Sequence, residues 1–340
     1  MLGKFRSIPE YRFIATVLLA TAIFLTFILA AAILVDPYGI FGLRLVEPLV
    51  LTNRDEKLSF LRATKPAPDA IIPGSSRVFL IDPNRIERLT GLRAFNASVS
   101  YARPEEYLAM TRHIVEDLGI KPKLVIVGVN VGELNHDPID PQTITNSKLR
   151  RYLPISKKEQ VTTILAVLKE RFNPNMVRDI FLALFYRARG YPGERVTFLS
   201  NGVQEFNRSA PPELEKIERT LHTAIRLFSS ETELSENRIK YFAAFIRFAD
   251  EHGIEVRVAI LPMPPRVVEA LKAETLYPKL LEDLKSFLEG ETRAHANLRV
   301  FDATELYLYN GDPQDFNDAT HPGPVNLDRI TDFILSDYRR

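Results

Sequence analysis

Short, strongly apolar runs recur along most of the chain and are separated by helical sequence. The runs cover residues 70–73, 93–95, 123–129, 254–261 and 298–301. Turn residues bound each run, which is typical of buried strands, and the intervening segments place apolar residues at helical spacing. Strand–helix–strand units of this kind form parallel sheets with right-handed crossovers. The sequence therefore predicts an α/β fold, a three-layer α/β/α sandwich around a parallel sheet.

The N-terminal region contains an uninterrupted uncharged stretch, Phe13 to Val35. At ~1.5 Å per residue, this stretch is long enough to cross a hydrocarbon layer of ~30 Å. Lys4, Arg6 and Arg12 precede it, so the positive-inside rule places residues 1–12 in the cytoplasm and everything after the span outside it. The alternative is a cleaved signal peptide, although apolar cores of signal peptides are usually shorter, ~7–15 residues. We expect an uncleaved transmembrane anchor over residues 13–35.

The sequence after the anchor divides into a linker and one large domain. Asp36-Pro37 breaks the helix, and residues 36–68 have the mixed composition of a linker. Residues 69–340 form the predicted α/β domain, which is interrupted at about 135–232 by helical, irregular sequence. We interpret this stretch as an insertion over the sheet edge that could act as a lid. Helices are predicted at residues 104–118, 157–172, 174–188, 212–228, 236–251, 266–288 and 325–338.

Composition excludes several classes of protein. The chain of 340 residues has a formal charge of +1, so no strongly basic face indicates nucleic-acid binding. It has no cysteine, which excludes disulfides, thiolate catalysis and cysteine metal sites but leaves the compartment open. A basic cluster at the start of the insertion is typical of a solvated face, or could bind an acidic polymer or lipid headgroups; its members are Lys148, Arg150, Arg151, Lys157 and Lys158.

Gly74-Ser75-Ser76 follows the first predicted strand, and a helix-compatible run begins at Arg77. Such a turn places a serine at the carboxyl edge of a parallel sheet, where sites in open α/β sheets form. A serine there becomes a nucleophile when a neutral imidazole can take its proton. His321 lies in a C-terminal loop with Asp318 three residues earlier, which is close enough to orient the ring. The candidate catalytic residues are therefore Ser76, His321 and Asp318.

Four short segments together resemble the conserved blocks of the SGNH (GDSL-type) hydrolases. They occur in the order of that superfamily and cover roughly residues 69–135 and 236–340; the segments are Gly74-Ser75-Ser76, Asn96-Ala97-Ser98-Val99-Ser100, Gly128-Val129-Asn130-Val131 and Asp318-Ala319-Thr320-His321. The chain is most similar to membrane-anchored relatives such as the D-alanyl transfer protein of teichoic acid synthesis and the alginate O-acetylation proteins. The resemblance implies a flavodoxin-like sandwich, acyl-ester chemistry and a nucleophile at Ser76.

The resemblance also implies an oxyanion hole, a set of donors that stabilises the negative oxygen formed during attack on an ester. The candidates are the backbone N–H groups of Ser76 and Ser98 and the side-chain amide of Asn130. The chain departs from the usual pattern at three places. Ser75 replaces an Asp, as in the anchored relatives, Ser98 replaces a Gly, and Val131 replaces an Asp beside Asn130.

A metal site is a weaker reading of the sequence. His136 and Asp137, with Asp140 nearby, include types of ligand that suit zinc or manganese. Pro138 indicates a plain turn, and no second histidine stands at helical spacing from His136. We therefore expect no metal and no cofactor.

Three functions remain open. The leading expectation is an extracytoplasmic serine esterase or O-acyltransferase, held in a bacterial cytoplasmic membrane with its domain in the periplasm. It would act on an exported polysaccharide or a lipid-linked glycan, together with a membrane-bound partner that supplies acyl groups. The alternatives are a catalytically inactive scaffold or glycan-binding partner, because a fold does not guarantee its chemistry, and a lipase-like hydrolase. No nucleic-acid partner is expected.

Overall fold

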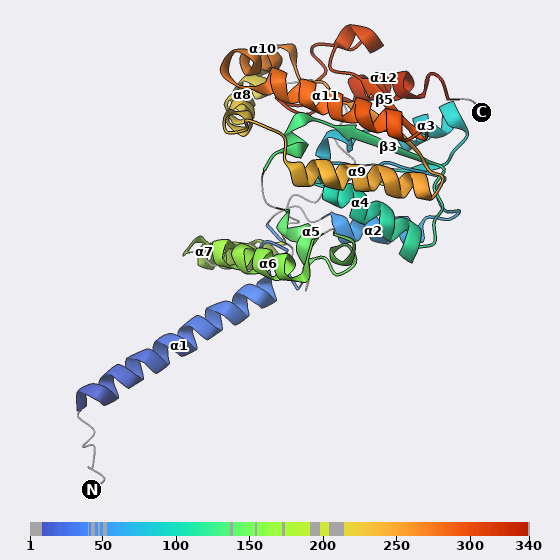
Figure 1. Ribbon diagram of the computed structural model, residues 1–340. Coiled ribbons are helices and arrows are strands. Elements are labelled where there is room, and N and C mark those ends of the chain that lie inside the picture. Colours follow the sequence, from blue (N-terminus) through green and yellow to red (C-terminus); the bar gives the residue numbers. More distant parts are fainter. Residues whose placement is uncertain are drawn as a thin grey trace. The chain divides into compact units, whose positions relative to one another are not determined.

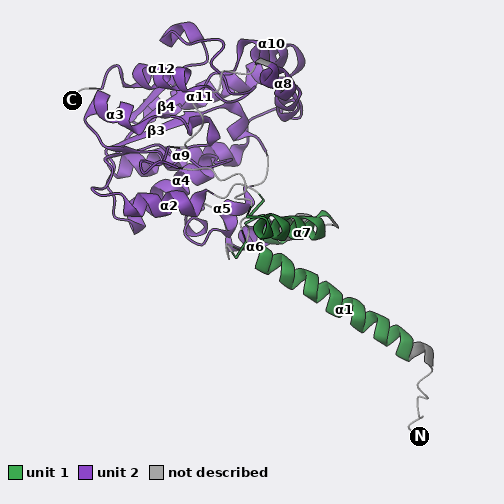
Figure 2. Ribbon diagram, turned by 180° about the vertical axis from the view of Figure 1, so that it is seen from behind, with its two compact units in different colours: residues 1–51, 164–195 green, residues 52–163, 196–340 purple. Residues whose placement is uncertain are grey.

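The structure is a computed structural model, and it divides the chain into two compact units (Figure 2). It describes residues 9–39, 41, 45–46, 48–49, 53–136, 139–153, 155–171, 174–190, 198–203 and 214–338. One unit combines residues 1–51 with 164–195, and the other combines 52–163 with 196–340. We call these the helical unit and the α/β unit.

The α/β unit contains a five-stranded parallel sheet in the order β2-β1-β3-β4-β5. The strands are β1 (Ala70–Ile71), β2 (Ala94–Phe95), β3 (Leu124–Val129), β4 (Glu255–Ile260) and β5 (Leu298–Asp302). The chain begins the sheet at β1, adds β2 on one side and then crosses to β3 on the other. This reversal puts a topological switch point between β1 and β3, where open α/β sheets bind ligands. The predicted fold class is confirmed.

Side-chain alternation along the strands divides the core into two layers. On one face of the sheet, Leu124 and Ile126 of β3 join a buried cluster with Ile86 of α3 (Pro83–Thr90) and Ile330 of α12 (Pro324–Leu335). Because successive strand residues point to opposite faces, Val125 and Val127 face the other layer. Helices α3 and α12 thus cover one side of β3, away from α4 and α9 (Figure 1).

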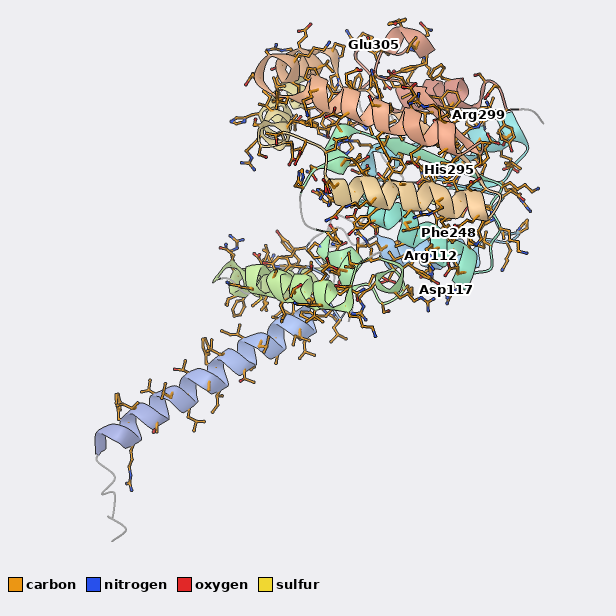
Figure 3. All side chains as sticks on the ribbon, viewed as in Figure 1. Arg112, Asp117, Phe248, His295, Arg299 and Glu305 are labelled. Carbon is orange, nitrogen blue, oxygen red and sulfur yellow. The ribbon has the colours of Figure 1, made fainter. Side chains whose placement is uncertain are left out.

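Aromatic rings fill the second layer, which is formed by α4 (Pro104–Arg112), α9 (Glu236–Glu251) and α11 (Tyr277–Ala294). The ring of Tyr107 meets that of Phe242 edge-on at a centroid distance of 6.0 Å, and Phe242 lies 5.9 Å from Phe287. The Arg112 guanidinium of α4 lies over the Phe248 ring of α9, 5.7 Å from its centroid (Figure 3). These contacts fix α4 and α9 against each other beneath the sheet.

The helical unit is built around α1 (Pro9–Val35) and α7 (Pro174–Ala188). The described span from Arg12 to Val35 is long and apolar enough to cross a membrane. The last two turns of α1 and one face of α7 share a small buried cluster of Ala32, Val35, Val46, Met176, Ile180 and Ala183. Tyr38 then donates a hydrogen bond from its hydroxyl to Asp179 Oδ2 at 2.7 Å.

The remaining helices belong to segments interpreted above as linker and insertion. Residues 1–8, which include part of the predicted cytoplasmic N-terminus, lie outside the described residues. Helix α2 falls within residues 36–68, and its Arg54, Lys57, Leu58 and Leu61 are buried. Within 135–232, α5 and α8 belong to the α/β unit, whereas α7 belongs to the helical unit. Their bounds are α2 (Arg54–Ala63), α5 (Pro141–Thr145), α6 (Lys157–Arg171) and α8 (Leu214–Ser229).

Two local predictions were wrong. The helix predicted over 266–288 is two helices, α10 (Pro265–Glu274) and α11, because Thr275 ends the first and its hydroxyl accepts a hydrogen bond from the Tyr277 N–H at 3.1 Å. The run after Ser76 forms only a 3-10 turn, η1 (Ser76–Val78), and the next helix begins at Pro83, capped by Asp82. The helix predicted over 104–118 is confirmed as far as Asp117, with its last turn, His113–Asp117, π-helical.

Candidate active site

The candidate site lies at the carboxyl edge of the sheet, around the switch point between β1 and β3. Residues after β1 supply Ser75 and Ser76, those after β2 supply Asn96 and Ser98, and those after β3 supply Asn130. Because the strands are parallel, these segments emerge at one edge. The loop before α12 contributes Asp318 and His321.

Asn96 holds the turn that carries Ser76. Its side-chain amide Nδ2 donates to the carbonyl oxygens of Val78 at 2.9 Å and Ile81 at 3.1 Å, at the end of η1. The Val78 carbonyl also accepts the Ile81 N–H at 3.2 Å, so the Asn96 amide adds a second partner there and ties the end of the turn to the segment after β2. The neighbouring loop is tied in by Val99, whose N–H donates to the Gly74 carbonyl at 2.8 Å. The nucleophile turn is therefore fixed from β2.

The structure brings Ser76, His321 and Asp318 together. Ser76 Oγ lies 2.8 Å from His321 Nε2 across 245 residues of sequence. On the other side of the ring, His321 Nδ1 lies 2.8 Å from Asp318 Oδ2 and 2.9 Å from Oδ1. With Nδ1–H donated to the carboxylate, Nε2 is the nitrogen that can accept the serine proton. The arrangement is that of a serine nucleophile, its base and an orienting carboxylate.

Asp318 is ionised in this arrangement. Burial opposes its charge, but hydrogen bonds from His321 and Thr320 outweigh burial and hold the pKa of the Asp318 carboxyl well below its usual range. Oδ1 also accepts the backbone N–H groups of Thr320 at 2.7 Å and His321 at 3.0 Å. The loop is fastened to α8, because the Thr220 hydroxyl accepts the Ala319 N–H at 3.0 Å. The last helix of the predicted insertion therefore supports the His321 loop.

The three oxyanion candidates differ in their present hydrogen bonds. The Ser98 N–H is donated to Asn96 Oδ1 at 3.1 Å, and the Ser98 hydroxyl is donated to the same oxygen. The Ser98 N–H can donate to a substrate oxygen only if its hydrogen bond to Asn96 breaks. Asn130 Oδ1 accepts the Gly132 N–H at 3.1 Å, which leaves its Nδ2 as the end that can donate to a substrate. The roles of Ser76, Ser98 and Asn130 as donors stay predictions.

Glu133 is a buried residue that the sequence reasoning missed. Its Oε1 accepts a hydrogen bond from the Ser75 hydroxyl and lies 3.9 Å from Arg77 Nη1, while its Oε2 accepts the Asn130 N–H at 3.0 Å. Glu133 therefore joins the loop after β1 to the loop after β3. Asn130 and Glu133 form a capping box on the 3-10 turn Val131–Leu134. An Asn followed three residues later by a Glu is a sequence signal for that box.

Lys57 is a second residue that the sequence did not single out. Its side chain is 1% exposed, and its ammonium donates to the Asn96 carbonyl at 2.8 Å and to the Gly202 carbonyl. The Phe198 ring lies 4.5 Å from the ammonium. Gly202 has φ of +82°, and a Cβ there would lie inside contact distance of the Asn96 oxygen, so only glycine fits. Lys57 thus holds the short segment 198–203 against Asn96.

The weaker metal reading gains no support from geometry. His136 Nδ1 lies 2.9 Å from Glu231 Oε2, an ordinary exposed pair, and Asp137 and Pro138 lie outside the described residues. Asp140 caps α5 by accepting the Gln142 N–H at 2.7 Å. Among the described residues, no group of three or more histidine or carboxylate side chains is placed to hold a metal ion.

Comparisons with known proteins give only distant structural likenesses, two of which are described below. No family model and no curated protein matches the chain. A proposed acylhydrolase from Bacteroides fragilis aligns with a TM-score of 0.37 and 9% identity, covering 84% of this chain and 92% of that one. A proposed platelet activating factor from Streptococcus pneumonia aligns with a TM-score of 0.35 and 11% identity over the same shares. Scores this low identify neither a family nor an activity.

Proposed function

We propose that the chain is a membrane-anchored serine esterase or O-acyltransferase of the SGNH type. As an esterase it would cleave an acyl ester on an exported polysaccharide or a lipid-linked glycan, and as an acyltransferase it would pass an acyl group to a hydroxyl of such a glycan. The observation that carries the proposal is the 2.8 Å contact between Ser76 Oγ and His321 Nε2, backed by Asp318. The order of the four sequence blocks supports the superfamily.

The chemistry follows from this contact. Ser76 Oγ attacks the ester carbonyl while His321 Nε2 takes the hydroxyl proton, and Asp318 stabilises the imidazolium. The negative oxygen of the tetrahedral intermediate would be met by the Ser76 N–H and the Asn130 amide. The intermediate then collapses, the alcohol leaves with the proton from His321, and an acyl-Ser76 remains. Water or a sugar hydroxyl attacks this ester, and the same proton transfers return free Ser76 and the product.

An inactive scaffold is the alternative, and one observation counts against it. A buried or displaced Ser76 would favour a protein that only binds a glycan. Instead, Ser76 is partly exposed and lies within hydrogen-bond distance of its base. We therefore favour the enzyme.

We place the α/β unit outside the cytoplasm, on a single-pass anchor formed by α1. The span from Arg12 to Val35 supports an anchor by its length and hydropathy, and the basic residues before it support an inside N-terminus. Such an anchor would hold the site where exported polymers emerge, beside a membrane-bound acyl donor. Resistance to alkaline carbonate extraction, with a periplasmic reporter fused after Arg340 active, is the expected result. Release of the intact chain by carbonate would contradict the anchor.

The test of the chemistry is labelling of the full chain by a fluorophosphonate, which reacts with activated serines. We expect labelling that Ser76→Ala and His321→Ala abolish, with Ser59→Ala, an exposed serine on α2, as the matched control. A folded wild-type chain that stays unlabelled would favour the scaffold. Acyl-chain preference in an ester panel then separates an acetyl-specific enzyme from a lipase-like one. Competition between water and a glycan acceptor for acyl-Ser76 separates hydrolysis from transfer.

A further inference from the structure

Helix α7 carries two apolar faces, and only one of them is used inside the protein. Met176, Ile180 and Ala183 are buried against α1. A second set, Phe181, Leu184 and Phe185, stands at spacings of three and four residues and is 68%, 40% and 52% exposed. Such spacing puts the three side chains on one face of the helix, and large exposed apolar faces mark interaction surfaces. We call this set the outer face of α7.

The attachment of α7 fixes its depth relative to the span. The α1 residues that join the shared cluster are Ile28, Ala31, Ala32 and Val35, all in the last eight residues of the helix. At ~1.5 Å per residue they lie within about 12 Å of its end. The whole span of 24 residues is about 36 Å long, against a hydrocarbon layer of ~30 Å. With the span centred in that layer, the contact covers about the outermost 9 Å of the acyl chains and the adjoining headgroups.

The same end of α1 presents an apolar surface to its surroundings. Phe27 and Leu34 of α1 are 71% and 52% exposed. The outer face of α7 is therefore apolar and exposed, as is the surface of α1 that would contact lipid in a bilayer. Basic side chains on and directly after α7 complete the pattern. Arg178 of α7 is exposed and paired with Asp179 at 2.9 Å. In the turn after α7, the Arg189 guanidinium lies 5.0 Å from the Phe185 ring centroid, as in helices whose arginines reach headgroups while their aromatic rings enter the acyl region.

We propose that α7 is an interfacial helix, whose outer face Phe181, Leu184 and Phe185 lies in the membrane boundary beside the end of α1, with its arginines at anionic headgroups. This inference rests on the proposed anchoring by α1. Helix α7 is part of the predicted insertion, which was interpreted above as a lid. The proposal assigns this part a lipid-binding role instead. The α1–α7 pair is then a two-helix membrane attachment.

The absence of tryptophan from the chain makes a direct test possible. Three single-tryptophan variants of the full chain are Phe24→Trp within the span, Phe181→Trp on the outer face, and Tyr307→Trp as an exposed reference in the α/β unit. Each is placed in vesicles of phosphatidylcholine and phosphatidylglycerol, either plain or with acyl chains brominated at shallow or deep positions. Bromine quenches tryptophan only on contact, so the loss of emission relative to plain vesicles reports depth. Iodide in solution reports exposure to water.

We expect deep bromines to quench Phe24→Trp and shallow bromines to quench Phe181→Trp, with iodide reaching only Tyr307→Trp. Quenching of Phe24→Trp with Phe181→Trp open to iodide would overturn the interfacial role of α7 and leave the anchor intact. Protection of Phe181→Trp from both bromine and iodide would assign its face to a protein contact and also overturn the proposal. If bromine quenches neither variant, the anchor itself fails.

Discussion

Removal of the Glu133 carboxylate tests whether this buried residue holds the candidate site together. The side chain is 7% exposed and accepts hydrogen bonds from the Ser75 hydroxyl and the Asn130 N–H. Hydrogen bonds to a charged group contribute ~1.5–3 kcal/mol each, and an orphaned buried donor costs ~1–3 kcal/mol. Without the carboxylate, the Ser75 hydroxyl can rotate toward another acceptor, whereas the backbone N–H of Asn130 is fixed and stays unpaired. We therefore expect Glu133→Ala to lower the free energy of unfolding by about 3 kcal/mol.

Glu133→Gln separates shape from charge. A glutamine can turn its oxygen to the Asn130 N–H and donate its amide to Ser75 Oγ, so both hydrogen bonds survive without charge. The expected loss is about 2 kcal/mol, because each of the two bonds loses the difference of about 1 kcal/mol between a charged and a neutral hydrogen bond. Both substitutions should also slow fluorophosphonate labelling of Ser76, and Glu133→Ala should slow it more.

The assay is guanidinium unfolding of the full chain in detergent, followed by near-ultraviolet circular dichroism, alongside the labelling rate. Glu289→Ala is the matched control, since this glutamate is 70% exposed on α11 and should stay within about 0.5 kcal/mol of the wild type. An alanine variant as stable as this control would refute the reasoning. So would a glutamine variant as unstable as the alanine one.

Three further predictions concern the site, the core and acid. Asp318→Asn should lower the labelling rate of Ser76 on the order of 10³–10⁴-fold, since the ring loses its orienting charge, with circular dichroism unchanged; a fall below tenfold would remove Asp318 from the mechanism. Gly128→Ala should cost about 1–3 kcal/mol in thermal unfolding, because its Cβ would lie 2.8 Å from Leu261 Cδ1; an unchanged Tm would contradict it. Burial, with nearby cations, lowers the pKa of His113 to about 4, and the unfolded chain therefore binds more protons between pH 4 and 6.5. The stability that the neutral His113 ring contributes is complete above pH 6.5, and about 3 kcal/mol of it is lost as the pH falls to 4. His113→Gln should abolish that part of the acid sensitivity in unfolding curves.

The sequence predicted the sheet because buried parallel strands leave a local signal. Residues 124–129 carry no polar side chain, and residues 255–260 alternate charged and apolar side chains before an apolar end; each strand begins and ends within about two residues of its predicted bounds. Helix ends depend on hydrogen bonds from individual side chains, which the periodicity of apolar residues does not reveal. Thr275 divides the predicted helix at 266–288 through its hydroxyl, which donates to the Leu271 carbonyl and accepts from Tyr277.

The candidate catalytic residues could be predicted from the sequence because they lie in short motifs that follow one another in a recognisable order. Ser76 and His321 are 245 residues apart, and periodicity alone could not have paired them. The supporting contacts had no comparable signal. Lys57 lies in a segment interpreted as linker, and its partners, Asn96 and Gly202, come from two other segments. A lysine is seldom fully buried, so its role becomes visible only when the fold closes around it.

Of the three departures from the pattern that the sequence resembles, those at positions 75 and 131 involve one buried residue, Glu133. At position 75 a hydroxyl stands where a carboxylate is usual, and it donates to a carboxylate supplied from another strand, that of Glu133. The same Glu133 accepts the Asn130 N–H, the support that Val131 cannot give. An aspartate at position 75 would therefore face Glu133 directly, and two buried carboxylates at hydrogen-bond distance cannot both ionise without a large cost. At position 98, the added hydroxyl is held by Asn96, which also carries the end of the nucleophile turn. Each of the two added hydroxyls thus has a buried acceptor at the same sheet edge, Glu133 for Ser75 and Asn96 for Ser98.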